Sequence, residues 1–193
     1  SVVQRVVADP DHRFEPFPLT DVQQAYLLGR DATFELGNVT STFYAELETV
    51  DLDLDLVEAA FNGLIARHDA LRTVFRADGY QQVLPEVPHY HLVREDVSDL
   101  EPPARAERLE QLRAQLSDCT FQVDTWPLFQ LRATRRDDRH TRLHLAFDLL
   151  ITDGASIARL LAELSVRYAQ PGRVWSGLEL SFRDYQVAVG AVV

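Results

Sequence analysis

The segment HLAFDLLITDGAS, residues 144–156, joins the end of a predicted strand to the start of a predicted helix. Apolar and polar side chains alternate up to Asp148, so a strand here puts Phe147 and Asp148 on opposite faces. Beyond Asp153, apolar residues recur at helical spacing over 154–170, which is typical of an amphipathic helix. A charged side chain near a buried strand end costs free energy unless it is paired, caps a helix or takes part in chemistry. Both aspartates therefore need an explanation.

Asp153 and Ser156 stand at the predicted start of that helix. A carboxylate before the first helical residue accepts hydrogen bonds from free N–H groups of the first turn, which gives Asp153 a structural role as a cap. Ser156 is placed to bond back to the backbone of Asp153. Asp148 has no such role, and a carboxylate at a strand end beside a helix N-terminus is a frequent position for functional groups. No further ligand is spaced to complete a metal site with the pair, and the single Cys119 indicates neither a zinc site nor an internal disulfide.

The rest of the chain predicts an α+β fold, in which helices cover a sheet. Strands are predicted at 38–48, on both sides of a turn at 78–79, at 89–96 and as a long hairpin over 127–150 that turns at 137–139. Helices are predicted at 21–29, 55–69, 102–118, 153–170 and 181–193. Thr20 is the expected cap of the first helix, and Asp55 with Glu58 is the expected capping box of the second.

Composition limits the functions that the chain can have. Its 193 residues, 46% of them hydrophobic, fit one domain or one lobe of a larger domain. A net charge of −11 gives no support to a surface that binds nucleic acid or an anionic membrane. The sequence has no apolar run long enough to span a membrane and no signal peptide, so we expect a cytoplasmic protein. It contains no Met, even at position 1, which predicts that the chain was cut from a longer polypeptide.

Four segments together make the chain resemble the heterocyclization domains of nonribosomal peptide synthetases. DLLITDGAS, 148–156, fits the D-x4-D-x2-S signature of that family. FPLTDVQQAYLLGR, 17–30, resembles its first core motif, FPLT-x2-Q-x-AY-x2-GR. RHDALRTVF, 67–75, resembles the second motif, which ordinary condensation domains share, and LELSFRDYQ, 178–186, resembles the segment that leaves the N-terminal lobe. The motifs follow the family order and extend over nearly the whole chain.

Leu149 separates two subfamilies within this resemblance. Ordinary condensation domains carry HHxxxDG here, and their second His is implicated in amide formation. In register, Asp148 stands at the first His, Leu149 at the second, and Asp153 with Gly154 matches the closing Asp-Gly. Leu149 cannot transfer a proton, which excludes a His-based mechanism at this position, and His144 lies four residues upstream along the strand. The cyclizing subfamily is therefore favoured.

The resemblance implies a lobe like that of chloramphenicol acetyltransferase, one of two that form a V with a tunnel between them. Upstream and downstream peptidyl carrier proteins would deliver substrates on 4′-phosphopantetheine arms, with no cofactor bound directly. Such domains join an acyl group to Cys, Ser or Thr and cyclodehydrate the product to a thiazoline or oxazoline, in natural product biosynthesis. Asp148 is then expected to orient the attacking amine or the lobe around it, and the groups for ring closure belong to the C-terminal lobe.

Within the resemblance, we divide the chain into an extended lead-in at 1–18, the N-terminal lobe at 19–180 and a terminal helix at 181–193 that leads toward an absent C-terminal lobe. The lobe alone is expected to be inactive. Asp153 is implied to pair with an arginine, for which Arg67 and Arg72 are the candidates. Tyr26 and Arg30 belong to the first motif and are explained equally well by packing of the opening helix.

Two other functions remain open. One is a condensation-type lobe that forms amides without cyclization. The other is a noncatalytic remnant that docks carrier proteins or stabilises a neighbouring domain. The intact D-x4-D-x2-S motif favours a lobe from a working enzyme, because a remnant would be free to lose it.

Overall fold

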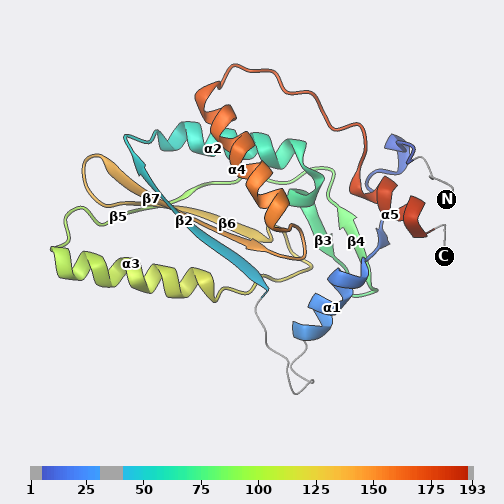
Figure 1. The fold of residues 1–193 in the computed structure, drawn as a ribbon, viewed down its shortest axis with the longest axis horizontal. Helices are drawn as coiled ribbons and strands as arrows, with labels where there is room; N and C mark the ends of the chain where they lie inside the picture. The colour runs from blue at the N-terminus through green and yellow to red at the C-terminus, as the bar shows by residue number, and fades with distance from the viewer. Residues whose placement is uncertain (1–5, 31–40, 191–193) are drawn as a thin grey trace.

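The computed structural model describes residues 6–30 and 41–190. Within them, the main sheet has four strands in the order β2-β7-β6-β5 (Figure 1). β2 pairs antiparallel with β7 and β7 antiparallel with β6, whereas β5 lies parallel to β6. The bounds are β2 Thr42–Val50, β5 Val93–Asp96, β6 Phe129–Arg135 and β7 His140–Asp148. The predicted mixed sheet is therefore confirmed, including the long hairpin of β6 and β7.

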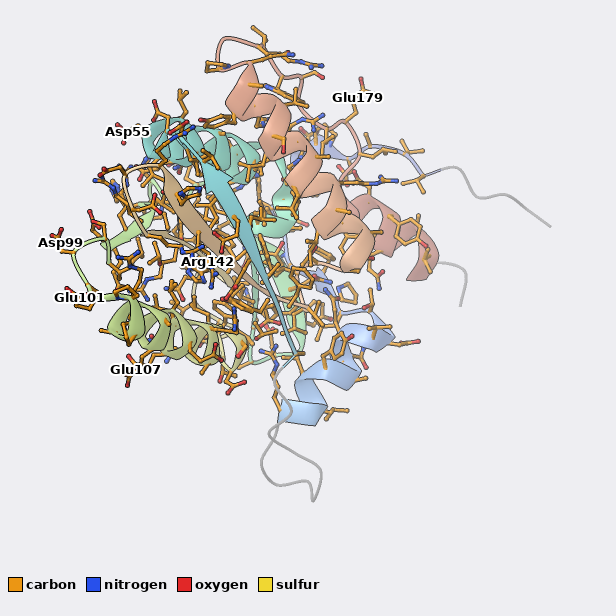
Figure 2. The ribbon with its side chains drawn as sticks, turned by 60° about the vertical axis from the view of Figure 1, so that its left-hand side comes forward. Asp55, Asp99, Glu101, Glu107, Arg142 and Glu179 are labelled. Atoms are coloured by element: carbon orange, nitrogen blue, oxygen red, sulfur yellow. The ribbon has the colours of Figure 1, made fainter. Side chains whose placement is uncertain are left out.

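Helices cover both faces of this sheet, with α2 (Leu54–Arg67) and α4 (Gly154–Ala169) on one face and α3 (Pro102–Ser117) on the other (Figure 1). The main hydrophobic core lies under α2 and α4. It includes Phe61, Leu64, Phe129, Leu145 and Phe147. The α3 side of the sheet combines the buried leucines of α3 with ion pairs: Figure 2 shows Arg142 within this layer, and the Arg142 side chain is only 14% exposed while it pairs with Glu46 and Glu48.

A second, smaller sheet lies beside the main one, with strand order β1-β4-β3. Its strands are β1 Phe17–Pro18, β3 Thr73–Phe75 and β4 Tyr80–Val83. The turn between β3 and β4 contains Gly79 at φ +82°, the left-handed region that glycine adopts without strain. The predicted lead-in is partly structured, because it contributes β1 and a short 3-10 helix, η1 (Pro10–His12).

The last described helix, α5 (Phe182–Gly190), packs against β1, so segments from both ends of the chain lie side by side (Figure 1). The rings of Phe17 and Phe182 meet edge to face with centroids 6.1 Å apart. The part of the predicted terminal helix beyond 190, and the start of the predicted strand at 38–40, lie outside the described residues. None of the helices that are described is long and apolar enough to cross a membrane.

Of the caps predicted for α1 (Asp21–Arg30) and α2, the first is confirmed and the second is wrong. α1 is capped as predicted, because Thr20 Oγ1 accepts from the N–H of Gln23 and Gln23 Oε1 accepts from the N–H of Thr20. The capping box predicted for α2 is wrong. Asp53 is the cap, and its Oδ1 accepts from the N–H of Asp55 and Leu56. The run DLDLDL offers aspartates at 51, 53 and 55, and the middle one caps the helix, which begins at Leu54 and buries Val57 and Phe61.

Candidate functional site

Asp148, the last residue of β7, is fully buried and forms an ion pair with Arg30 at the end of α1. Its Oδ1 accepts from Arg30 Nη2 at 2.5 Å and from the N–H of Leu150 at 2.9 Å. The same Arg30 nitrogen donates to Ser41 Oγ. Oδ2 of Asp148 accepts no hydrogen bond from the part of the chain that the structure describes. The ion pair thus joins the end of the first motif to the start of D-x4-D-x2-S.

The alternation predicted for β7 is confirmed up to Asp148. Leu143, Leu145 and Phe147 belong to the main hydrophobic core, whereas Asp148 lies on the other face. Because Asp148 is 0% exposed, its carboxylate does not reach a substrate directly in this arrangement. Asp148 instead fixes two segments at this end of the sheet, α1 through Arg30 and the turn after β7 through the N–H of Leu150.

Leu149 does not continue the alternation, because β7 ends at Asp148 and the chain turns there. The N–H of Ile151 donates to the carbonyl of Asp148 at 3.1 Å, which closes a turn over 148–151. Leu150 and Ile151 are buried members of the hydrophobic core, and Leu149, predicted on the core face, is instead half-buried; all three line a cavity. The residue that stands at the histidine position of the condensing relatives therefore faces open space.

This cavity has a volume of about 390 Å³ and lies where α1, β4, the turn at 148–151, the start of α4 and α5 meet. Leu149, Asp153 and Ser156 all contribute to its wall, and Asp148 does not. Asp153 and Ser156 of the D-x4-D-x2-S motif thus line the cavity, whereas Asp148 is buried behind its wall.

Asp153 caps α4 as predicted. Its Oδ1 accepts from the N–H of Ser156 at 2.7 Å, so Ser156 bonds to the carboxylate rather than to the backbone that we expected. Hydrogen bonds from Ser156, above all from its backbone N–H, hold the pKa of Asp153 below the ordinary value of 3.8. Both side chains are exposed on the cavity side of the helix start.

The predicted pairing of Asp153 with Arg67 or Arg72 is wrong for the described residues. Arg67 Nη1 pairs with Glu163 farther along α4 at 2.6 Å. Arg72 is buried and pairs with Asp69 at 2.9 Å, within the short helix η2 (Asp69–Arg72). Each arginine has a nearer carboxylate, and the N–H groups of α4 already satisfy Asp153. The arginine that pairs with an aspartate of the motif is Arg30, and its partner is Asp148.

Two glutamines that the sequence analysis missed brace the cavity. Gln23 and Gln81 are buried and exchange hydrogen bonds between their amides at 3.0 and 2.8 Å. Gln23 Nε2 also donates to the carbonyl of Leu150 at 2.9 Å, and Gln81 Nε2 to that of Pro18 at 3.1 Å. Gln23 is one of the matched positions of the first motif, which was the available signal. Its partner Gln81 lies 58 residues away on β4, and no motif in the sequence pointed to it.

Tyr26 and His144 lie outside the cavity wall. Tyr26 is 36% exposed on α1, and whether it contacts a substrate stays a prediction. His144 is fully buried on the α3 side of the sheet, where Nδ1 lies 2.8 Å from the Tyr44 hydroxyl and Nε2 lies 3.2 Å from Thr134 Oγ1. Burial lowers the pKa of His144 to about 4, so the ring is neutral at neutral pH. His144 thus does not replace the absent histidine, as expected.

Comparison with known proteins agrees with this geometry. Residues 16–189 match the family model described as the condensation domain. Pyochelin synthetase PchF of Pseudomonas aeruginosa is 38% identical over 180 residues, which are 92% of this chain and 10% of PchF. Phenyloxazoline synthase MbtB of Mycobacterium tuberculosis is 32% identical over 179 residues, which are 92% of this chain and 12% of MbtB. The chain thus spans about a tenth of the length of these relatives.

Among solved structures, the cyclization-docking bidomain of the nonribosomal peptide synthetase EpoB from Sorangium cellulosum superposes with a TM-score of 0.92. It is 34% identical, and the match covers 97% of this chain and 38% of that one. The X-domain in complex with OxyB from teicoplanin biosynthesis superposes with a TM-score of 0.78 at 22% identity, which shows a shared fold.

Proposed function

The chain belongs to the condensation domain family, and on that premise we propose that it is the N-terminal lobe of a heterocyclization domain in a nonribosomal peptide synthetase. One observation carries the proposal. Leu149 faces the cavity at the position where condensing relatives carry their second histidine, and Asp153 and Ser156 flank it on the cavity wall. The likeness to a cyclization bidomain and to a phenyloxazoline synthase supports the same subfamily.

The proposed reaction has two stages. First, the amine of a carrier-bound Cys, Ser or Thr attacks the thioester carbonyl of the upstream acyl group; a C–N bond forms, the C–S bond breaks and the thiol leaves with the proton from nitrogen. Next, the side-chain sulfur or oxygen attacks the new amide carbon, and the amide oxygen departs as water. A C=N bond remains, in a thiazoline or oxazoline ring. Holding the amine at the thioester is chiefly a matter of positioning, which an apolar Leu149 permits.

We assign different roles to the motif residues. Asp148 and Arg30 are positioning residues, since their ion pair fixes the turn that presents Leu149. Asp153 and Ser156 contact the substrate space directly, with Asp153 also holding the start of α4. Arg67, Arg72 and Tyr26 are proposed to be structural, through ion pairs in the case of the two arginines.

A second lobe is the proposed partner of the face formed by α1 and α5. Both helices expose large apolar side chains, and both contribute to the cavity wall. Those of Val22 and Phe182, 61% and 44% exposed as residues, also line the cavity. Covering them with a C-terminal lobe would turn the open cavity into a tunnel. Peptidyl carrier proteins would then insert phosphopantetheine arms from its two ends, and no cofactor would bind to the lobe itself.

The test uses the synthetase segment that contains this chain and a following lobe, together with upstream and downstream carrier proteins loaded with their thioesters. Mass spectrometry of the product should find a molecule that has lost one water relative to the amide. Amide without loss of water would instead support the condensation-type lobe. A folded segment that gives neither product would support the noncatalytic remnant. Azoline formation by residues 1–193 alone would contradict the need for a second lobe.

A further inference from the structure

Glu58, His89 and His91 bring one carboxylate and two imidazoles together, outside the cavity described above. One ligand atom from each residue lies within 4.8 Å of the other two. Glu58 Oε1 is 3.1 Å from His89 Nε2 and 3.6 Å from His91 Nδ1. The cluster lies between α2 and the segment that leads into β5, at the end of α2 where Figure 2 shows Asp55, away from α1 and α5. We propose that this triad is a binding site for Zn²⁺.

The backbone directs both histidines to the same side. Tyr90, between them, is buried, and its hydroxyl donates to the carbonyl of Leu131 at 3.1 Å and accepts from the N–H of Leu131 at 2.8 Å. In an extended segment the two neighbours of a buried residue face the opposite way. The side chains of His89 and His91 are accordingly 54% and 81% exposed, and their ring centroids are 4.9 Å apart. The anchored tyrosine therefore places both imidazoles on the same side of the segment, beside Glu58.

Glu58 is held so that one oxygen faces the histidines. Its Oε2 accepts from the N–H of Leu92 at 2.9 Å and from Arg94 at 3.3 Å, which leaves Oε1 directed at the two rings. The Leu92 N–H is the main cause that lowers the pKa of Glu58 to about 2, so the carboxylate is ionised at neutral pH. Arg94 also pairs with Asp55 at 2.8 Å, which balances its positive charge beside an incoming cation.

This donor set suits zinc better than it suits the hard cations. Two imidazoles and one carboxylate are a known zinc ligand set, with the fourth position left to water, whereas calcium and magnesium prefer oxygen ligands alone. The exposed side of the triad is open to that water, because His89 also lies on the rim of a cavity of about 490 Å³. Coordination requires the three ligand atoms to move closer to one ion at about 2.0–2.2 Å, and the two exposed rings are free to rotate inward.

Sequence spacing gave no sign of this site, since Glu58 precedes His89 by 31 positions and no Cys/His motif is involved. Only the packing of α2 against the segment before β5 brings them together. A bound ion would tie these two segments to each other. It would therefore raise the thermal stability of the chain, by an amount that grows with the logarithm of the free zinc concentration once that exceeds the dissociation constant.

The test is a titration of the 193-residue chain, first stripped with EDTA, with Zn²⁺ in an isothermal calorimeter, followed by thermal unfolding with and without zinc. We expect one saturable site and a rise in Tm that EDTA reverses. His91→Ala removes an exposed ring and should weaken binding by about tenfold or more without unfolding the chain. Glu58→Gln keeps an oxygen that accepts from the Leu92 N–H and should weaken binding similarly.

The matched control is His140→Ala, which removes a half-exposed histidine that contacts a single carboxylate, Asp137. Its zinc affinity should equal that of the unsubstituted chain. The absence of a saturable site would overturn the proposal. So would an affinity that His91→Ala and Glu58→Gln leave unchanged, or one that His140→Ala lowers as much as they do, since zinc would then bind non-specifically to surface histidines.

Discussion

Arg30, the last residue of α1, donates a hydrogen bond of 2.5 Å to the carboxylate of Asp148, the last residue of β7. The two residues are 118 positions apart, and Arg30 retains only 14% exposure of its side chain while Asp148 has none. Arg30 also lies at the C-terminus of α1, where the helix dipole stabilises a positive charge. This one contact therefore fixes the opening helix against the strand end from which the cavity wall begins.

Asp148→Ala should destabilise the chain by about 3–5 kcal/mol, because it leaves the Arg30 guanidinium largely buried without its counterion. Urea unfolding at neutral pH measures the loss. The double variant Arg30→Met, Asp148→Leu removes both charges and should recover most of it. In the two-lobe segment, Asp148→Ala should also lower both condensation and cyclization. A single variant as stable and active as the parent would refute the positioning role.

Asp153→Ala should cost about 1 kcal/mol, the usual effect of losing a helix cap, whereas Asp153→Asn should retain most of the stability because Asn also caps. The folded pKa of Asp153 is lower than its ordinary value of 3.8. The stability that this ionised group contributes is thus present above pH 3.8 and is lost as the pH falls through the folded pKa. Urea unfolding at pH 7 and pH 3 checks this. Equal losses for the Ala and Asn variants at pH 7 would contradict capping by Asp153.

Local patterns predicted much of this site correctly. The alternation up to Asp148 and the cap at Asp153 depend on neighbours within a few residues, and both agree with the structure. Leu149 was misplaced because the exact end of β7 depends on the turn that Leu150 and Ile151 make into the core. One residue of difference at a strand end reverses the face of a side chain.

The contacts that join distant segments could not be predicted. Arg30 and Asp148 each belong to a recognised motif, yet nothing in the sequence pairs them, and Arg67 and Arg72 fit the role of partner equally well by type. Burial decides the outcome, since each arginine binds the carboxylate that packing brings nearest. The strand β1 was missed for the same reason, because a two-residue strand forms only where β4 offers it an edge.

The reciprocal amide pair of Gln23 and Gln81 should behave as one unit. Gln23→Leu or Gln81→Leu alone leaves buried polar groups without partners and should lower the free energy of unfolding by about 1–3 kcal/mol. The double variant should lose less than the sum of the two, with a coupling of about 0.5–3 kcal/mol measured by a double-mutant cycle in urea. Gln24→Leu, at an exposed position of the same helix, should change stability by less than about 0.5 kcal/mol. Additive losses would show that the two amides act independently.

His144 should make the chain sensitive to mild acid. Burial is the main cause that lowers its pKa to about 4; Arg142 and Arg132 lower it further, and Glu46 opposes them. The pKa of the unfolded chain lies near 6.5, so the unfolded state binds the proton first, and the free energy of unfolding falls as the pH drops from about 6.5 to about 4. The expected loss is on the order of 3 kcal/mol, since each unit of pKa difference corresponds to about 1.4 kcal/mol.

Urea unfolding at intervals between pH 7 and pH 4 measures this loss, with His144→Gln as the variant that removes the titrating ring while it retains a polar group beside the Tyr44 hydroxyl, which itself donates to Glu46 Oε1. The variant should show a flatter pH dependence over this range. His140→Gln, which alters a half-exposed ring, should keep the full slope of the parent. Glu46 stays ionised throughout, because Arg113 is the main cause that lowers its pKa to about 2. The unfolded chain binds a proton at Glu46 only near the ordinary value of 4.5, so Glu46 adds slope at the acid end of this range and His144 accounts for the slope nearer pH 6. Identical slopes near pH 6 for the parent and His144→Gln would show that another group senses the acid.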